Sequence, residues 1–312
     1  MPTGACTVLR MAGKITAVGA VIGCLVSSPG LPAAHAAAAD CPNGGTVRFG
    51  VEPYETAAKL VPIYDRIGSI MAKALGCDVQ IFVTTSYTAE VEAMRAGKLE
   101  AGEFSPFSYI LAHTIAHADV VAIFADSGGT PLTYTAGIVT WPGSGITTLA
   151  QISGHSFGYS DPASNSGHLF PAYALKKAGI DPDKGIKPLY SGSHTASYEA
   201  LRNHKVDAAE LNSQQIESSK LSGIYKESDF VELWRSEPIP SDPIVVRSDL
   251  EPAFKARLTK VLQSLDLSSL SPEDQKILVG GVVGVRAVPI ADSFYDVIRD
   301  VAKVMNIDPA KL

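Results

Sequence analysis

Hydrophobic positions along the chain follow two periods that take turns. Short apolar runs of strand character are each followed by a stretch in which apolar residues return every three or four positions, the spacing of a helix with one buried face. The elements expected up to residue 140 are strands at 46–51, 79–83, 99–104, 120–124 and 136–140, and helices at 57–75, 87–97 and 109–117. This alternation favours a mostly parallel sheet wound by helices.

A second cycle of the same kind begins after the turn residues 141–143. A turn-rich stretch at 238–243 closes it and leads into a strand at 244–247, and from Pro252 onward the chain is helical. The segments expected within this cycle are 149–152, 156–159, a helix after Ser166, 186–189, a helix at 196–202 and a strand at 208–211.

Two α/β units of similar length, the second inserted between parts of the first, predict a two-lobed protein with a cleft. We expect 46–137 and 245–312 to form lobe 1 and 138–244 to form lobe 2. The crossovers between the lobes would lie near 137–141 and 238–246.

The N-terminus has the pattern of a secretory signal. Arg10 and Lys14 precede an apolar run at 15–26, and small residues ending at Ala36 follow it. A basic start, a short apolar centre and an Ala-x-Ala site predict a cleaved signal peptide at 1–36. The apolar run is short for a membrane span. We therefore expect a protein of the periplasm.

Two other interpretations of this segment stay open. A lipoprotein signal would place the lipid on Cys24, which follows Val-Ile-Gly in the sequence. A start at Met11 would remove Arg10 from the signal but keep Lys14.

The charge of the chain argues against a nucleic-acid partner. Its 312 residues carry a net charge of −6, and cleavage after residue 36 removes two basic residues and no acidic one. Nucleic-acid-binding surfaces need an excess of lysine and arginine, which is the opposite balance. No later apolar stretch approaches the length of a membrane span, so we expect a soluble product, and we expect a monomer.

Two cysteines remain after cleavage, Cys41 and Cys77. In an oxidising compartment they predict a disulfide between the N-terminal segment and the loop after the first helix. The alternative, a two-cysteine metal site, lacks nearby His, Asp or Glu at ligand spacing. We expect neither a metal nor a cofactor.

The segment 161–168, Asp-Pro-Ala-Ser-Asn-Ser-Gly-His, is the strongest candidate for binding chemistry. It opens a helix, and the first turn of a helix has unpaired N–H groups and the positive end of the dipole. Ser164, Asn165 and Ser166 add side-chain donors there, and Gly167 allows close approach of the backbone. The segment predicts an anion site, although the same serines also suit a helix cap without a ligand.

Two common phosphate-binding motifs are missing from the sequence. It has no phosphate loop and no Gly-x-Gly-x-x-Gly after a strand. A Ser-His-Asp triad could be assembled from His194 and Asp161 only by assertion. We therefore expect a binding protein rather than an enzyme.

Six segments occur in the order found in one known family. They lie at 46–51, 103–109, 161–167, 192–194, 206–208 and 239–243. Together they resemble the periplasmic phosphonate/phosphite-binding proteins of ABC transporters, within the type 2 periplasmic binding fold. The resemblance implies an α/β protein of two lobes, each a mixed sheet wound by helices, with the ligand cleft between them.

The resemblance also implies ligand contacts. Family members hold a tetrahedral oxyanion with the hydroxyl-rich loop, here Ser164, Asn165 and Ser166, and with the His of a following loop, here His194. Most relatives have Thr at the position of Asn165, which makes the shape of the pocket at that position differ.

Aromatic and acidic residues complete the expected site. Tyrosines of the first lobe would close over the ligand, and Tyr54 and Tyr109 match them. Tyr134 lies near a lobe crossover, where binding and packing roles both fit. For an amine-bearing ligand the family adds carboxylates, and the chain offers Glu210 and Asn212 nearby.

The function implied is capture of a small tetrahedral oxyanion, a phosphonate, a phosphite or a related phosphorus oxyanion, for an ABC importer. The partner would then be a membrane permease. An alternative with the same cleft is a sensor that signals to the periplasmic domain of a histidine kinase.

Overall fold

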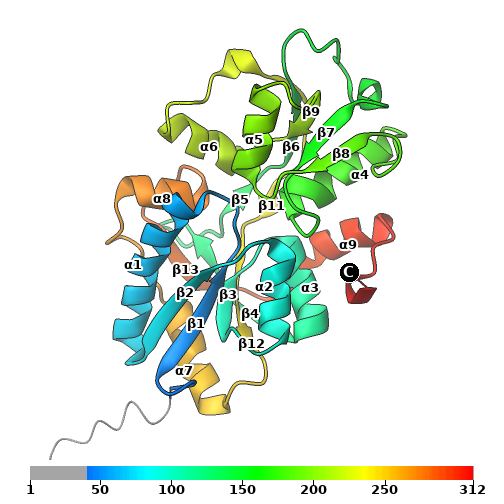
Figure 1. The fold of residues 1–312 in the computed structure, drawn as a ribbon. Coiled ribbons are helices and arrows are strands. Elements are labelled where there is room, and N and C mark those ends of the chain that lie inside the picture. The colour runs from blue at the N-terminus through cyan, green and yellow to red at the C-terminus, as the bar shows by residue number, and fades with distance from the viewer. Residues whose placement is uncertain (1–40, 312) are drawn as a thin grey trace, which may run out of the picture. The chain divides into compact units, whose positions relative to one another are not determined.

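The computed structural model describes residues 41–311 (Figure 1). The predicted signal peptide at 1–36 lies outside this range, as do the alternatives at Cys24 and Met11. Among residues 41–311, no helix is long and apolar enough to cross a membrane.

The first sheet has six strands in the order β13-β4-β12-β3-β1-β2. Strand β1 runs parallel to both β2 and β3, whereas β12 and β13 pair antiparallel with their neighbours. The parallel pairing that the alternation favours therefore holds only for the first part of the sheet, because later segments of the chain return to it in the opposite direction. The strands are β1 (Thr46–Val51), β2 (Asp78–Val83), β3 (Ala101–Glu103), β4 (Ala118–Ala125), β12 (Pro243–Arg247) and β13 (Arg286–Pro289).

The second sheet has five strands in the order β10-β6-β9-β7-β8. Strand β7 pairs parallel with β8 and β9, and β6 pairs antiparallel with β9 and β10. Both sheets are mixed, and the expected fold class is confirmed. The strands are β6 (Gly137–Thr140), β7 (Ser156–Tyr159), β8 (Lys187–Tyr190), β9 (Ala208–Glu210) and β10 (Val231–Arg235).

A two-stranded ladder joins the segments that pass between the two sheets. Strand β5 (Thr133–Tyr134) pairs with β11 (Ile239–Pro240). Chain order places β5 between β4 and β6, and β11 between β10 and β12. Both passages between the sheets therefore run side by side. The lobe boundaries at 137/138 and 244/245 stay a prediction.

Nine α-helices follow or cover these strands in the described part of the chain. Helix α1 shows why they form: Leu60, Tyr64, Ile67 and Met71 recur at helical spacing, and all are buried beside β2. Each such side chain contributes about 1.5–3 kcal/mol when fully buried. The helices are α1 (Ala57–Leu75), α2 (Tyr87–Arg95), α3 (Pro106–Ala116), α4 (Phe170–Lys177), α5 (His194–Arg202), α6 (Ser213–Leu221), α7 (Pro252–Leu262), α8 (Pro272–Val279) and α9 (Asp296–Val304).

Shorter turns of helix connect several elements. A π-helical turn, η3 (Asn165–Leu169), leads directly into α4, and a 3₁₀ turn, η5 (Asp292–Tyr295), leads into α9. The segment Leu149–Ile152 is also a 3₁₀ turn.

A disulfide joins Cys41 to Cys77, whose Cα atoms are 5.9 Å apart. Cys41 precedes β1, and Cys77 lies between α1 and β2. The bond therefore ties the start of the described chain to the first strand-helix-strand unit.

Candidate functional site

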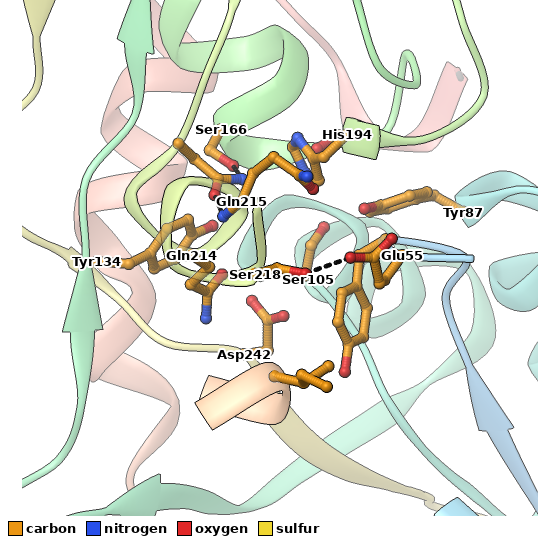
Figure 2. A pocket seen from close by; sticks show the side chains of 14 residues that line it. Glu55, Tyr87, Ser105, Tyr134, Ser166, His194, Gln214, Gln215, Ser218 and Asp242 are labelled. Atoms are coloured by element: carbon orange, nitrogen blue, oxygen red, sulfur yellow. Dashed lines mark hydrogen bonds between the residues drawn. The ribbon is translucent and has the colours of Figure 1, made fainter. Parts of the chain in front are cut away.

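One small cavity gathers most of the polar candidates (Figure 2). The centre of a water-sized sphere can move through about 20 Å³ of the cavity. This space suits one compact chemical group rather than an extended ligand. Neither lysine nor arginine occurs among the residues that line it. These residues are Tyr54, Glu55, Tyr87, Ser105, Tyr134, Ser164, Ser166, His194, Asn212, Gln214, Gln215, Ser218, Asp242 and Ile277.

The lining residues come mainly from the beginnings of helices. Each of these helical segments follows a strand: α1, α2 and α3 follow β1, β2 and β3, and η3, α5 and α6 follow β7, β8 and β9. The side chains at their starts include Tyr87, Ser105, Ser164, His194 and Asn212. First-turn N–H groups lack partners within the helix and carry partial positive charge. The cavity can therefore hold an anion without a fixed cation in its wall.

Ser166 is prepared to donate a hydrogen bond into the cavity. The side-chain oxygen of Asn212 caps α6 by accepting from the backbone N–H of Gln215, 2.7 Å away. The amide nitrogen of Asn212 therefore faces Ser166 and donates to its hydroxyl oxygen over 3.1 Å. With that oxygen already accepting, the hydroxyl proton of Ser166 is left for another acceptor.

Ser164 has the same arrangement. Its hydroxyl oxygen accepts from the backbone N–H of Gly167 over 3.1 Å, as the cap of η3. Gly167 itself does not line the cavity. A Cβ atom there would lie 1.7 Å from the hydroxyl oxygen of Ser160, so no larger residue fits without a shift. The glycine allows the loop to pack, and Ser164 faces the cavity.

Asn165 supports the site from behind. Its side chain is fully buried outside the cavity wall, and its amide nitrogen donates to the hydroxyl of Tyr134 over 3.3 Å. Tyr134 lines the cavity and also shares a hydrogen bond with Ser166, so this pair has one hydroxyl proton left to donate. Asn165, the position at which most relatives have Thr, thus orients Tyr134.

Tyr109 is not brought to the cavity. Its hydroxyl donates to Asp292, and its ring packs edge-on against Tyr295 at 5.3 Å between centroids. The sequence predicts a helix start at residue 109, but α3 begins at Pro106, capped by Ser105. Tyr109 therefore lies within the first turn of α3, where its side chain meets η5.

His194 is paired with a buried carboxylate. Its Nδ1 atom lies 2.9 Å from both carboxylate oxygens of Glu210, and the two side chains are almost completely buried. Burial acts to lower the pKa of His194, but the charge and hydrogen bond of Glu210 outweigh it, so the pKa is raised. The imidazolium form is thereby favoured. Because Glu210 is committed to His194 and does not line the cavity, it does not face a ligand amine as the sequence suggests.

Two carboxylates that sequence reasoning missed also line the cavity, Glu55 and Asp242. Glu55 accepts from Lys59 over 2.7 Å and from the hydroxyl of Thr195. It also accepts from the hydroxyl of Ser218 (Figure 2). Burial acts to raise the pKa of Glu55, but these hydrogen bonds outweigh it and lower the pKa. Burial raises the pKa of Asp242 to about 7, and the nearby His194 opposes part of that rise.

A family model now decides the assignment. The model describes the periplasmic substrate-binding protein of phosphonate ABC transporters, and it matches residues 49–295. The chain belongs to this phosphonate-binding family. Members of the family are periplasmic substrate-binding proteins that work with a membrane permease. They are transport proteins rather than enzymes.

Individual relatives agree with the family. The phosphate-import protein PhnD of Mycolicibacterium smegmatis is 24% identical over 282 residues, which cover 85% of this chain and 88% of the relative. The crystal structure of a binding protein of an ABC phosphonate transporter from Pseudomonas aeruginosa is 25% identical, with a TM-score of 0.72 over 84% of this chain and 87% of that one. PhnD1 from Prochlorococcus marinus, in complex with methylphosphonate, is 21% identical and shares the fold, with a TM-score of 0.72 over 84% of this chain and 98% of that one.

The remaining lining residues of this phosphonate-binding protein carry a recognisable signal. Most sit within three residues of a helix start that follows a strand, as Tyr87 and Gln215 do. Asp242 lies in the turn-rich stretch before β12, which the sequence marks as a crossover and as a family segment but not as a source of a binding residue. The lining residues that the sequence analysis did not propose are Glu55, Tyr87, Ser105, Gln214, Gln215, Ser218, Asp242 and Ile277.

Proposed function

We propose that the protein captures a small tetrahedral phosphorus oxyanion, a phosphonate or phosphite, and delivers it to the permease of an ABC importer. One observation carries the proposal. Ser164, Ser166 and Tyr134 each accept from a fixed N–H group, and Ser166 and Tyr134 also share one hydrogen bond, so the proton of Ser164 and one proton of the Ser166–Tyr134 pair are left to donate into the cavity. Together with the imidazolium of His194, they supply the donors that a compact anion needs when it loses its water.

Asp242 favours phosphorus over sulfur in the ligand. Its carboxylate lines the cavity and accepts no hydrogen bond from residues 41–311, so a bound group must either offer it a proton or repel it. A phosphonate or phosphite can keep one proton on oxygen near neutral pH, and that P–OH group can donate to Asp242. A sulfonate has no such proton. An ammonium group on an aminoalkyl phosphonate would satisfy Asp242 equally well.

The size of the cavity supports a compact ligand. The relatives named above include one that imports phosphate and one whose structure holds methylphosphonate, both of which are compact tetrahedral anions. A transport role is favoured over the sensor alternative because the matching family model is that of ABC transporters.

Calorimetric titration of the purified mature chain tests the proposal. The ligands are phosphite, methylphosphonate, aminoethylphosphonate and phosphate, with methanesulfonate and sulfate as controls of the same shape. We expect at least one of the phosphorus compounds to bind well below millimolar concentration and the sulfur controls to bind far more weakly. Binding of none of the four, or equal binding of methanesulfonate and methylphosphonate, would overturn it.

A further inference from the structure

A series of three hydrogen-bonded side chains leads from the cavity into the first sheet. Tyr54 lines the cavity, and its hydroxyl oxygen lies 3.1 Å from that of Tyr64 in α1. The hydroxyl of Tyr64 lies 2.8 Å from a carboxylate oxygen of Glu103 at the end of β3. Tyr64 and Glu103 are buried, so water cannot replace these partners without a cost.

The number of protons on these three side chains determines the direction of the hydrogen bonds between them. When Glu103 is ionised, Tyr64 must donate its single hydroxyl proton to the carboxylate. Tyr64 can then only accept from Tyr54. The hydroxyl proton of Tyr54 is therefore used in that hydrogen bond, and only the lone pairs of its oxygen are available to the cavity. When Glu103 carries a proton, it can donate to Tyr64, and Tyr64 can donate to Tyr54. The proton of Tyr54 is then released toward the cavity.

Tyr54 therefore differs from the other hydroxyls of the site. Those of Ser164, Ser166 and Tyr134 are held as donors by fixed N–H groups. Tyr54 is held by a group that titrates. We infer that Glu103 is a positioning residue for ligand selection: it acts through Tyr64 to set Tyr54 as a donor when protonated and as an acceptor when ionised. Capture of an oxyanion through Tyr54 is thus coupled to uptake of a proton by Glu103. The inference rests on the proposed function.

The surroundings of Glu103 make uptake of a proton less costly than it is for a free carboxyl group. Burial and the charge of Asp242 raise its pKa well above the usual carboxyl range, and the hydrogen bond from Tyr64 only partly opposes them. The neighbouring carboxyl of Glu90 is fully buried and has no hydrogen-bond partner among residues 41–311. Its pKa is also raised by burial and by Glu52 and Glu103. The titratable groups that act on Glu103 from the packed elements are Tyr54, Tyr64, Glu90, Asp242 and Tyr295. None of these five side chains can carry a positive charge.

A double-mutant cycle on methylphosphonate affinity tests the chain. Glu103→Gln supplies an amide that can donate to Tyr64 at every pH, which fixes Tyr54 as a donor. At pH 8.5 we expect Glu103→Gln to bind methylphosphonate about 3- to 10-fold more tightly than the unchanged protein. In a Tyr54→Phe background the same substitution should have no effect, since the end of the chain is missing.

Calorimetry in buffers of different ionisation enthalpy adds a count of protons. The number taken up per ligand should fall in Glu103→Gln by up to about one. Glu90→Gln is the matched control: it removes a carboxyl from the same buried cluster but no hydrogen bond to a tyrosine, and it should keep most of the uptake. If Glu103→Gln does not fold, Tyr64→Phe replaces it, because loss of that hydroxyl also frees the proton of Tyr54.

The outcomes separate the two proposals. If the unchanged protein binds none of the phosphorus compounds, the proposed function fails, and this inference fails with it. If it binds methylphosphonate but the substitution at Glu103 acts equally in both backgrounds, or leaves the proton count unchanged, the inference alone is overturned.

Discussion

The ammonium group of Lys59 in α1 donates to the hydroxyl of Ser218 in α6 over 3.1 Å, although the two helices follow strands of different sheets. Glu55 joins the same contact, since it accepts from both residues and from Thr195 in α5. One carboxylate at the rim of the cavity thus holds together helices that belong to the two sheets. Closure around a ligand and this network stabilise the same arrangement.

Glu55→Gln should weaken ligand binding by about 10-fold, because a neutral amide accepts less strongly from Lys59 and the two hydroxyls. The effect should come from a faster dissociation rate, since the cavity opens more readily. Hydrogen bonds lower the pKa of Glu55, so this stabilisation is complete above the usual carboxyl range and is lost as the pH falls through the lowered pKa. Stopped-flow dissociation and small-angle X-ray scattering without ligand measure both effects.

The control for this substitution is Glu92→Gln. Glu92 is exposed on α2 and pairs only with Arg95 of the same helix. Its dissociation rate should match that of the unchanged protein. Equal rates for Glu55→Gln and Glu92→Gln would show that the network does not hold the cavity closed.

The pair of His194 and Glu210 leads to a prediction that needs no ligand. The pKa of His194 is raised because Glu210 outweighs the effect of burial. In Glu210→Gln the burial remains and the charge of Glu210 is gone, so the pKa of His194 should fall from its value in the unchanged protein, while Asp242 and Glu55 still act to raise it. Titration of the imidazole signals by NMR measures it, with the exposed Glu217→Gln as control. A histidine that titrates alike in both proteins would contradict the pairing.

The same pair sets a pH dependence of stability. A raised folded pKa means that the stabilisation by protonated His194 is complete below the unfolded pKa and is lost as the pH rises through the folded one. The free energy of unfolding should therefore fall over that interval in the unchanged protein. In Glu210→Gln this loss should disappear.

Local sequence patterns identified three residues that line the cavity, and their role in binding stays a prediction. Ser164, Ser166 and His194 lie in or next to the first turn of a helix, and a helix start after a strand can be found from the sequence alone. The helical period also predicted the bounds of α1 correctly, because its apolar residues repeat over five turns.

The rest of the site depends on how distant segments meet. Glu55 reaches the cavity because α1 packs near α5 and α6, which lie some 140 residues further along the chain. Asp242 reaches it because β11 and β5 bring the two passages between the sheets together. The family resemblance matches Tyr109 to the site, but the local sequence does not show that its side chain packs against η5, where it meets Asp292 and Tyr295.

Ser166→Ala should weaken binding of the phosphorus ligand by about 1–3 kcal/mol, the cost of one hydrogen bond to a charged group. Ser166 lines the cavity, and it shares with Tyr134 one hydroxyl proton that is left for the ligand, because Asn212 and Asn165 donate to the two oxygens. Tyr109→Phe is the control, since Tyr109 gives its proton to Asp292 away from the cavity. Isothermal calorimetry compares the two variants. Equal affinities would show that the anion does not bind at the loop 164–167.

Gly167→Ala should destabilise the fold itself. The added Cβ atom would lie 1.7 Å from the hydroxyl oxygen of Ser160 and 2.8 Å from that of Ser164, and both side chains are buried. Overpacking of this kind costs about 1–3 kcal/mol, which urea unfolding of the ligand-free protein can measure. Ser160→Gly removes the closest atoms, so the double variant should regain part of the loss. A Gly167→Ala protein as stable as the unchanged one would mean that the loop can shift without cost, and its ligand affinity should then be unchanged as well.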